Sequence, residues 1–249
     1  MSEHAIDLNA DMGEYADAAQ RATEAALMPL ISSCSVACGG HAGDETTMRE
    51  TIRLAKTHNV SIGAHPAYPD REGFGRRHLI FDPDELSSSL RAQISSLEKI
   101  SKLEGVALRH VKPHGALYND AAKNLTLAKL IASAARNYTL VGPPGSALEQ
   151  AARDNAGAFA AEGFVDRLYQ ASGALTPRTE PGAIIPDVNR RADQALAIAR
   201  SDSFDAAEGS LRLAIKTLCI HADSPGAVET AKTVRSKLEE NGFFIRAFV

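Results

Sequence analysis

Residues 31–64 read ISSCSVACGGHAGDETTMRETIRLAKTHNVSIGA and contain a complete strand, helix and strand in succession. Short runs of small and apolar residues at Ile31–Ala37 and Val60–Ala64 predict the two strands. Between them, apolar residues recur every three or four positions after Asp44, a residue that caps helix N-termini. A helix that connects two neighbouring strands makes them parallel, so this unit predicts a parallel sheet covered by helices.

The same alternation continues on both sides of this unit. Helices are predicted to begin at Asp82-Pro83, at Ser146 and at Ser224-Pro225, the last one running to Asn241. Seven or eight strands in a chain of this length favour a closed (β/α) barrel over an open sheet. Tyr169–Ile185 is rich in Gly, Pro and Thr and predicts a long loop over one end of the barrel. The other predicted strands are Ala5–Asn9, Ala107–Lys112, Thr139–Gly142, Ala158–Ala161, Leu211–Ile220 and Phe243–Val249.

Composition narrows the class of protein. The chain has 249 residues, 44% of them hydrophobic, and a net charge of −4 without a cluster of basic residues, which disfavours a nucleic-acid partner. No apolar stretch approaches the roughly 18 residues of a membrane span, and no interdomain linker is evident, so residues 1–249 predict one domain. The first residues, MSEHAIDLNADMGE, lack the pattern of a secretory signal. The chain has three cysteines, an odd number that argues against a disulfide framework. We therefore expect a cytoplasmic protein with reduced thiols.

Polar and ionisable residues follow the predicted strands. In a parallel barrel the active site lies at the carboxyl ends of the strands, so these side chains are expected to meet there. Four of the eight histidines occupy such positions. The residues concerned are Asn9, Asp11, Glu14, His41, Asp44, His65, Lys112, His114, Asn119, Glu162, Asp166, Arg167, His221 and Asp223.

Two kinds of chemistry fit this set. Asp11, His41 and His65 could bind a divalent metal ion that activates water. The same groups could instead act as general acids and bases without a metal, which is the interpretation we favour. Lys112, at the end of an apolar strand, is expected to be partly buried beside an anionic group of the site or of a substrate.

Several of these residues also have purely structural interpretations. Asp44 and Asp223 could do no more than cap the helices that follow them. Cys34-x3-Cys38 is half of a zinc motif, but no second cysteine pair follows, and buried thiols are the favoured interpretation. The segment Gly142–Ser146 lies between a strand and a helix, yet neither a Walker A motif nor a GxGxxG motif is present. The sequence therefore contains no recognisable site for ATP.

Six segments of this chain resemble the LamB/YcsF family. They occur in order along the chain and together they are very specific to that family. The segments are Ile6–Glu14 (IDLNADMGE), Ala37–Asp44 (ACGGHAGD), Ile62–Arg77 (IGAHPAYPDREGFGRR), Val111–Asn119 (VKPHGALYN), Glu162–Leu175 (EGFVDRLYQASGAL) and Cys219–Ala227 (CIHADSPGA).

The resemblance implies an α/β fold, the distorted (β/α)7–8 TIM-like barrel of the glycoside hydrolase/deacetylase type. It also implies the role of the A subunit of a 5-oxoprolinase, which opens the lactam 5-oxo-L-proline to L-glutamate at the expense of ATP, together with subunits B and C. On this basis Asp11, Glu14, His41, His65, Lys112 and His114 are the predicted catalytic residues. The predicted substrate-binding residues are Asn9, Asn119, Glu162, Asp166, Arg167, His221 and Asp223.

Two other functions stay open on the sequence. One is a metal-dependent carbohydrate or N-acyl deacetylase, which the Asp and His residues would suit. The other is a non-catalytic subunit that binds the lactam for its partners. ATP is expected to bind with or on the partner subunits, because this chain has no phosphate-binding loop, and a divalent metal is left undecided.

Overall fold

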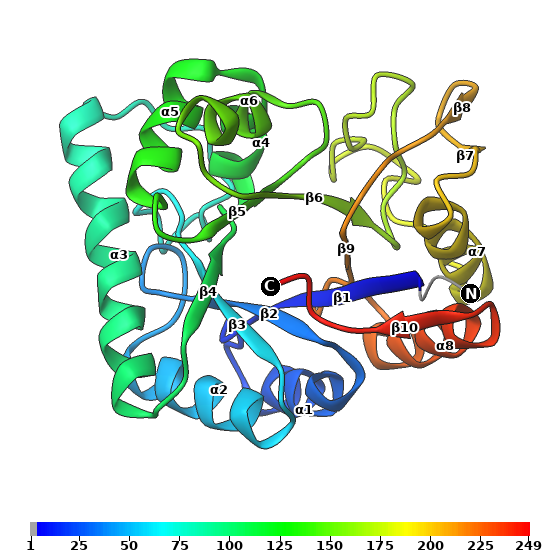
Figure 1. Cartoon of the computed structure of the whole chain (residues 1–249), viewed down its shortest axis with the longest axis horizontal. Coiled ribbons are helices and arrows are strands. Elements are labelled where there is room, and N and C mark those ends of the chain that lie inside the picture. The colour runs from blue at the N-terminus through cyan, green and yellow to red at the C-terminus, as the bar shows by residue number, and fades with distance from the viewer. Residues whose placement is uncertain (1–3) are drawn as a thin grey trace.

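The computed structural model describes residues 4–249, so Met1–Glu3, part of the stretch used to argue against a secretory signal, lie outside the described residues. Seven parallel strands form a closed barrel in the order β1-β2-β3-β4-β5-β6-β9, because β9 pairs both with β6 and with β1 (Figure 1). This confirms the predicted (β/α) barrel. The strands are β1 (His4–Met12), β2 (Ser33–Ala37), β3 (Ser61–His65), β4 (Leu108–Val111), β5 (Thr139–Gly142), β6 (Phe159–Phe164) and β9 (Thr217–Cys219).

Helices surround the barrel and bury its outer face (Figure 1). Three of the predicted N-caps are confirmed. Asp44 accepts a hydrogen bond from Thr47 N at 2.8 Å, Asp82 accepts one from Asp84 N at 2.9 Å, and Ser146 accepts one from Glu149 N at 3.4 Å. One continuous apolar core lies between strands and helices. The helices are α1 (Ala18–Leu27), α2 (Glu45–Thr57), α3 (Pro83–Leu103), α4 (Gly115–Lys123), α5 (Leu125–Ala134), α6 (Ala147–Asp154), α7 (Val188–Ala199) and α8 (Ala227–Glu240), with a 3-10 turn at Met28–Leu30.

Two strands extend further than predicted, and this decides what they contribute to the barrel. β1 continues past Asn9 to Met12, so Asp7, Asn9 and Asp11 alternate along a strand with apolar neighbours. Alternate residues of a barrel strand face the interior, which places these three polar side chains inside the ring while the residues between them pack against the helices. In the same way β6 runs on to Phe164 and includes Glu162, which is buried.

The predicted strand Leu211–Ile220 is wrong. Leu211 ends β8 (Ser210–Leu211), which pairs in antiparallel fashion with β7 (Phe204–Asp205) outside the barrel. The barrel strand β9 covers only Thr217–Cys219, which pair with Asp7–Asn9 of β1 and with Glu162–Phe164 of β6. The alternation of apolar residues includes both β8 and β9, but a strand forms only where a neighbouring strand is available for hydrogen bonding.

The C-terminal segment and the last helix also differ from the prediction. The predicted strand Phe243–Val249 is only β10 (Phe243–Ile245), which pairs with the start of β1 rather than forming a barrel strand. The residues after β10 cross the middle of the barrel (Figure 1). The aromatic ring of Phe248 packs near that of His110, with 5.3 Å between the two ring centroids. α8 begins at Ala227 after Gly226, so Ser224-Pro225 does not open the helix as predicted.

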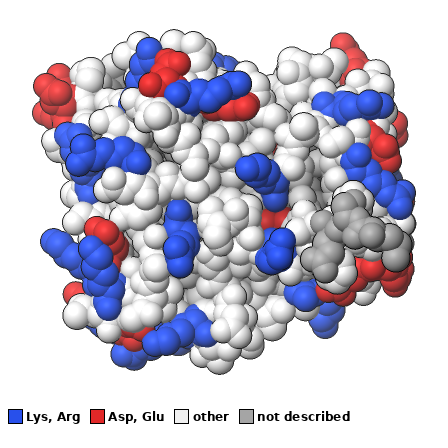
Figure 2. Space-filling view, viewed as in Figure 1, with Lys and Arg blue, Asp and Glu red and all other residues white. Residues whose placement is uncertain are grey.

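The remaining predictions concern loops and surfaces. Tyr169–Ile185 contains only isolated bridges and turns, which confirms the long loop. On the face drawn in Figure 2, Lys and Arg residues stand in small groups separated by uncharged and acidic residues. Within residues 4–249 there is no helix of the length and apolar character that a bilayer crossing requires.

Candidate functional site

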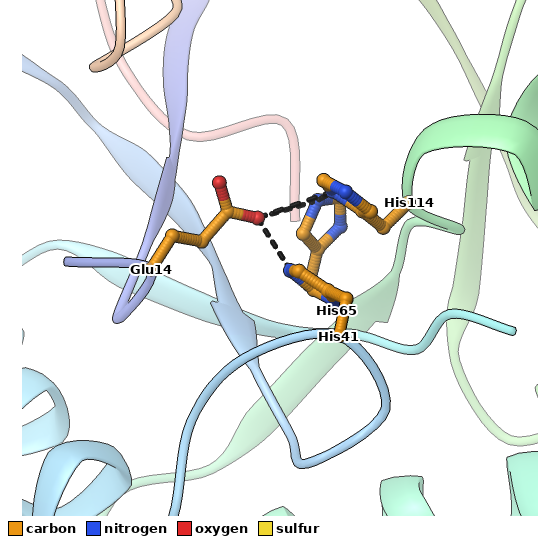
Figure 3. A group of neighbouring side chains, drawn as sticks. All are labelled: Glu14, His41, His65 and His114. Carbon is orange, nitrogen blue, oxygen red and sulfur yellow. Dashed lines mark hydrogen bonds and ion pairs between the residues drawn. The ribbon is translucent and has the colours of Figure 1, made fainter. Parts of the chain in front are cut away.

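One cluster at the carboxyl ends of consecutive strands contains a carboxylate and three imidazoles (Figure 3). Glu14 lies in the loop after β1, His41 in the loop after β2, His65 at the end of β3, and His114 directly before α4. Glu14 Oε1 lies 2.6 Å from His41 Nε2, 3.1 Å from His114 Nδ1 and 3.5 Å from His65 Nε2. The structure therefore unites four of the six predicted catalytic residues around a single oxygen atom.

In two of these rings, the other ring nitrogen contacts a backbone carbonyl. His65 Nδ1 lies 2.8 Å from the carbonyl oxygen of Lys112, and His114 Nε2 lies 3.0 Å from that of Phe74. The rings of His41 and His114 stack in parallel, with their centroids 3.6 Å apart. Each ring is thus fixed in orientation by its surroundings as well as in position.

Burial and charge change the acidities of this cluster. Burial lowers the pKa of His41 to about 4. Burial acts in the same direction on His65, but the carboxylates of Asp11 and Glu14 outweigh it and raise the pKa of His65. For Glu14, burial alone would raise the pKa, whereas interaction with His114 and His41 outweighs it and lowers the pKa. At neutral pH the carboxylate of Glu14 is ionised and the ring of His41 is uncharged.

The remaining two predicted catalytic residues form an ion pair beside this cluster. Lys112 Nζ lies 3.0 Å from Asp11 Oδ1 and 2.8 Å from Glu162 Oε1, and all three side chains are largely buried. Burial would lower the pKa of Lys112, but Asp11, Cys219 and Glu162 raise it well above its usual value. Asp11 Oδ2 is also 3.4 Å from His65 Nε2, so the ion pair and the histidine cluster are in contact.

Glu162 and Asn9 support this lysine. Asn9 Nδ2 donates to Glu162 Oε1 at 3.0 Å, and the Tyr118 hydroxyl donates to Glu162 Oε2 at 3.0 Å. Asn9 Oδ1 lies 3.4 Å from Lys112 Nζ. Both predicted substrate-binding residues are therefore engaged in holding the buried charge of Lys112.

A second histidine–carboxylate pair lies on the loops after β6 and β9. His221 Nδ1 is 2.8 Å from Asp166 Oδ1, and Ser224 Oγ donates to the other oxygen of Asp166. Burial alone would raise the pKa of Asp166, but His221 and Ser224 lower it to about 2. An ionised carboxylate bonded to one ring nitrogen fixes the tautomer of His221 and leaves the other nitrogen for chemistry. Both were predicted to bind substrate.

The last three predicted substrate-binding residues have different partners. Arg167 is buried and donates to the carbonyls of Ala183 and Thr176, so it fastens the loop 169–185. Asp223 accepts from Arg76 at 2.6 Å and Arg178 at 3.2 Å, and it does not cap α8. Asn119 is exposed on α4 and donates to the carbonyl of Gly115, so the structure does not bring it into the cluster.

Sequence reasoning missed the residues that hold the loops of the site. Glu24 on α1 accepts from the backbone N–H groups of Gly13 and Glu14, at 2.7 and 3.0 Å. Gln93 on α3 pairs with both the N–H and the C=O of Ala67, at 3.0 Å each. A polar residue on the apolar face of a predicted helix is the signal that could have indicated Gln93, because a buried amide needs hydrogen-bond partners.

The comparisons with known proteins place this geometry in a family. A model described as the LamB/YcsF family matches residues 6–249. The A subunit of 5-oxoprolinase from Symbiobacterium thermophilum is 44% identical over 97% of this chain and 95% of its own length. The lactam utilization protein of Thermus thermophilus is 40% identical, with a TM-score of 0.90 over 98% of this chain and all of its own.

A more distant likeness concerns the fold alone. The structure of a T48 deacetylase aligns with a TM-score of 0.52 at 12% identity, over 98% of this chain and 88% of its own. This agrees with the (β/α) barrel described above. Because the family model matches residues 6–249, and so includes every loop of the cluster, the chain belongs to the LamB/YcsF family.

Proposed function

We propose that this chain is the A subunit of a 5-oxoprolinase, which hydrolyses the lactam of 5-oxo-L-proline to L-glutamate. The observation that carries the proposal is the match, over nearly the full length of both chains, to a relative named as the A subunit of 5-oxoprolinase. The site fits a cyclic amide, since its opening requires proton transfer to and from nitrogen and water, and acids and bases converge at the barrel mouth.

The reaction needs a driving force, because a five-membered lactam is an unstrained amide that re-forms readily from glutamate. We propose that the lactam oxygen takes the terminal phosphoryl group of ATP, with ADP as the leaving group. One water then adds to the activated carbon and the C–N bond breaks, leaving an acyl phosphate. A second water releases phosphate and gives glutamate, so each turnover consumes one ATP and two waters.

In this scheme the groups of the main cluster activate water and move protons. Asp11, Glu14, His41, His65 and His114 are the proposed residues, and Lys112 holds the carboxylate of Asp11 in place beside His65. His221, oriented by Asp166, serves as a further acid or base. Arg167 is a better partner than Lys112 for the substrate carboxylate, because Lys112 already has two carboxylate partners and the described residues give Arg167 none.

ATP binding and the partners belong to the same proposal. The relatives are named as A subunits, which supports a complex with other subunits that we propose to be B and C. ATP is proposed to bind with or on those subunits, because the segment Gly142–Ser146 lacks the residues of a phosphate-binding loop. A cytoplasmic location stays a prediction, which fractionation of cells would test.

The deciding experiment is glutamate release from 5-oxo-L-proline. The chain is assayed alone and with subunits B and C, each with and without ATP. We expect glutamate only when both partners and ATP are present. Absence of glutamate with folded, bound partners would contradict the proposal and favour a metal-dependent carbohydrate or N-acyl deacetylase. Turnover that survives substitution of the cluster would instead indicate a non-catalytic lactam-binding subunit.

A further inference from the structure

The hydrogen bonds of two histidine rings fix where their lone pairs point. A backbone carbonyl can only accept, so His65 Nδ1 and His114 Nε2, which face carbonyls, must carry the ring protons. When both rings are neutral, as metal ligands must be, His65 Nε2 and His114 Nδ1 are bare lone pairs. These two atoms lie 3.0 Å apart, and both face the carboxylate oxygen of Glu14. Three acceptor atoms thus converge on one point.

The spacing of these three atoms is that of ligands around one ion. Donors held at about 2.0–2.1 Å in a tetrahedral site lie roughly 3.3 Å from one another. The separations here are 3.0 Å between the two nitrogens, and 3.1 and 3.5 Å from Glu14 Oε1 to His114 and His65. Ligating histidines in proteins characteristically donate their other ring N–H to a carbonyl or carboxylate, as both rings do here.

Charge points the same way. The carboxylates of Asp11, Glu14 and Glu162 lie in one connected, mostly buried group. Lys112 is an ammonium that pairs with Asp11 and Glu162, whereas Glu14 contacts the histidines. The three carboxylates and one ammonium leave a surplus of negative charge, which a divalent cation would balance. Buried carboxylates without counter-charge are strongly unfavourable, so the site is suited to a cation.

We propose that Glu14, His65 and His114 bind one divalent transition-metal ion of the zinc type, with a coordination position left open. Imidazole and carboxylate ligands suit such ions, and three protein ligands with an open position are typical of catalytic zinc sites. An ion bound there supplies a Lewis acid that lowers the pKa of a bound water. The sequence favoured metal-free chemistry or a site at Asp11, His41 and His65; Asp11 is instead paired with Lys112.

His41 has a different part in this site. Its Nδ1 is buried without a hydrogen-bond partner in the described part of the chain, which places the ring proton on Nε2. That nitrogen then donates to Glu14 Oε1 at 2.6 Å, and the ring stacks on His114. His41 is therefore a positioning residue that orients two ligands rather than a ligand itself.

The test measures metal binding directly, without substrate or partner subunits. Wild-type protein treated with a chelator is titrated with Zn²⁺ by calorimetry and with Co²⁺ by visible absorption. We expect one ion per chain, cobalt bands of a four-coordinate site and a higher melting temperature. Chelator-treated wild type that binds neither ion would overturn the proposal. Because no lactam is involved, this result is separate from success or failure of the glutamate assay.

Variants then assign the ligands. His114→Gln is expected to weaken Zn²⁺ binding at least about 100-fold, and His41→Asn roughly 10- to 100-fold, as for residues that orient ligands. His110→Asn is the control, since His110 is a buried histidine next to Ser35 and outside the cluster. Circular dichroism checks folding. Binding by a folded His114→Gln variant as tight as that of wild type would refute the ligand assignment.

Discussion

Lys112 is the single residue on which the buried charges of the barrel depend most. Replacing it by Met leaves the carboxylates of Asp11 and Glu162 without their counter-ion, so the free energy of unfolding is expected to fall by about 3–5 kcal/mol. Urea denaturation measures this change. Lys129→Met is the matched control, because its ion pair with Asp154 is exposed and contributes less than about 1 kcal/mol. Equal losses in the two variants would contradict the structural account.

Asp166 is expected to act on catalysis through His221. Asp166→Asn removes the charge that fixes the His221 tautomer, so kcat of the reconstituted complex should fall by roughly 10²–10⁴ with little change in KM. Steady-state assay of glutamate release measures both constants. Asp193→Asn, which changes an exposed acid paired with Lys237, serves as the control. An unchanged kcat in Asp166→Asn would remove His221 from the proposed chemistry.

The loop between β3 and α3 is a structural element that shapes the histidine cluster. Gly75 in this loop has φ +63°, and a Cβ there would lie 3.0 Å from both His114 Cδ2 and His41 Cβ. Gly75→Ala is expected to cost about 1–2 kcal/mol through its backbone alone and to weaken Zn²⁺ binding by displacing the rings. Gly145 has a similar φ of +69° and open space around it, so Gly145→Ala should lower the free energy of unfolding without changing the affinity for Zn²⁺. Equal Zn²⁺ affinity in the two variants would be evidence against this packing.

Asp7 on strand β1 makes the free energy of unfolding depend on pH. Burial raises the pKa of Asp7 from 3.8 to about 6, despite hydrogen bonds from Ser32, Thr217 and Ser33. A carboxyl with a raised pKa stabilises the fold below pH 3.8, and this contribution is lost as the pH rises through 6. Between pH 4 and 7, wild type should therefore lose on the order of 3 kcal/mol relative to Asp7→Asn. Urea denaturation at both pH values tests this, with the exposed acid variant Asp202→Asn as control; parallel curves for wild type and Asp7→Asn would refute it.

On the scale of the whole molecule, Asp223 joins loops from distant parts of the chain across the barrel mouth. Its carboxylate binds Arg76 from the loop after β3 and Arg178 from the loop 169–185. Asp223→Ala should change unfolding free energy by less than about 1 kcal/mol, because these ion pairs are exposed. In the assay of glutamate release, the KM for 5-oxo-L-proline should rise while kcat changes little, since the loops would no longer be held together over the substrate. Glu50→Ala, which breaks the surface pair with Arg21, is the control; an unchanged KM in Asp223→Ala would show that this link does not shape the mouth.

The barrel could be predicted because its evidence is local. The period of apolar residues and the capping residues Asp44, Asp82 and Ser146 fix elements over a few neighbouring positions, and alternation of strand and helix then leaves little choice of topology. The prediction failed at Leu211–Ile220, where one apolar run divides between a ribbon and the barrel. Strand pairing with β1 and β6 decides that boundary, and those partners are distant in sequence.

Local patterns were therefore enough to predict the class of fold and the end of the barrel that holds the candidate site, since Glu14, His65 and Lys112 follow predicted strands. Long-range packing determines which of these residues meet. It turned Asn119 outward on α4, paired Lys112 with Asp11, and aimed two histidine lone pairs at Glu14 through carbonyls of other loops. The physical reason is that ring orientation and charge pairing depend on contacts between residues tens to more than a hundred positions apart, which no local pattern encodes.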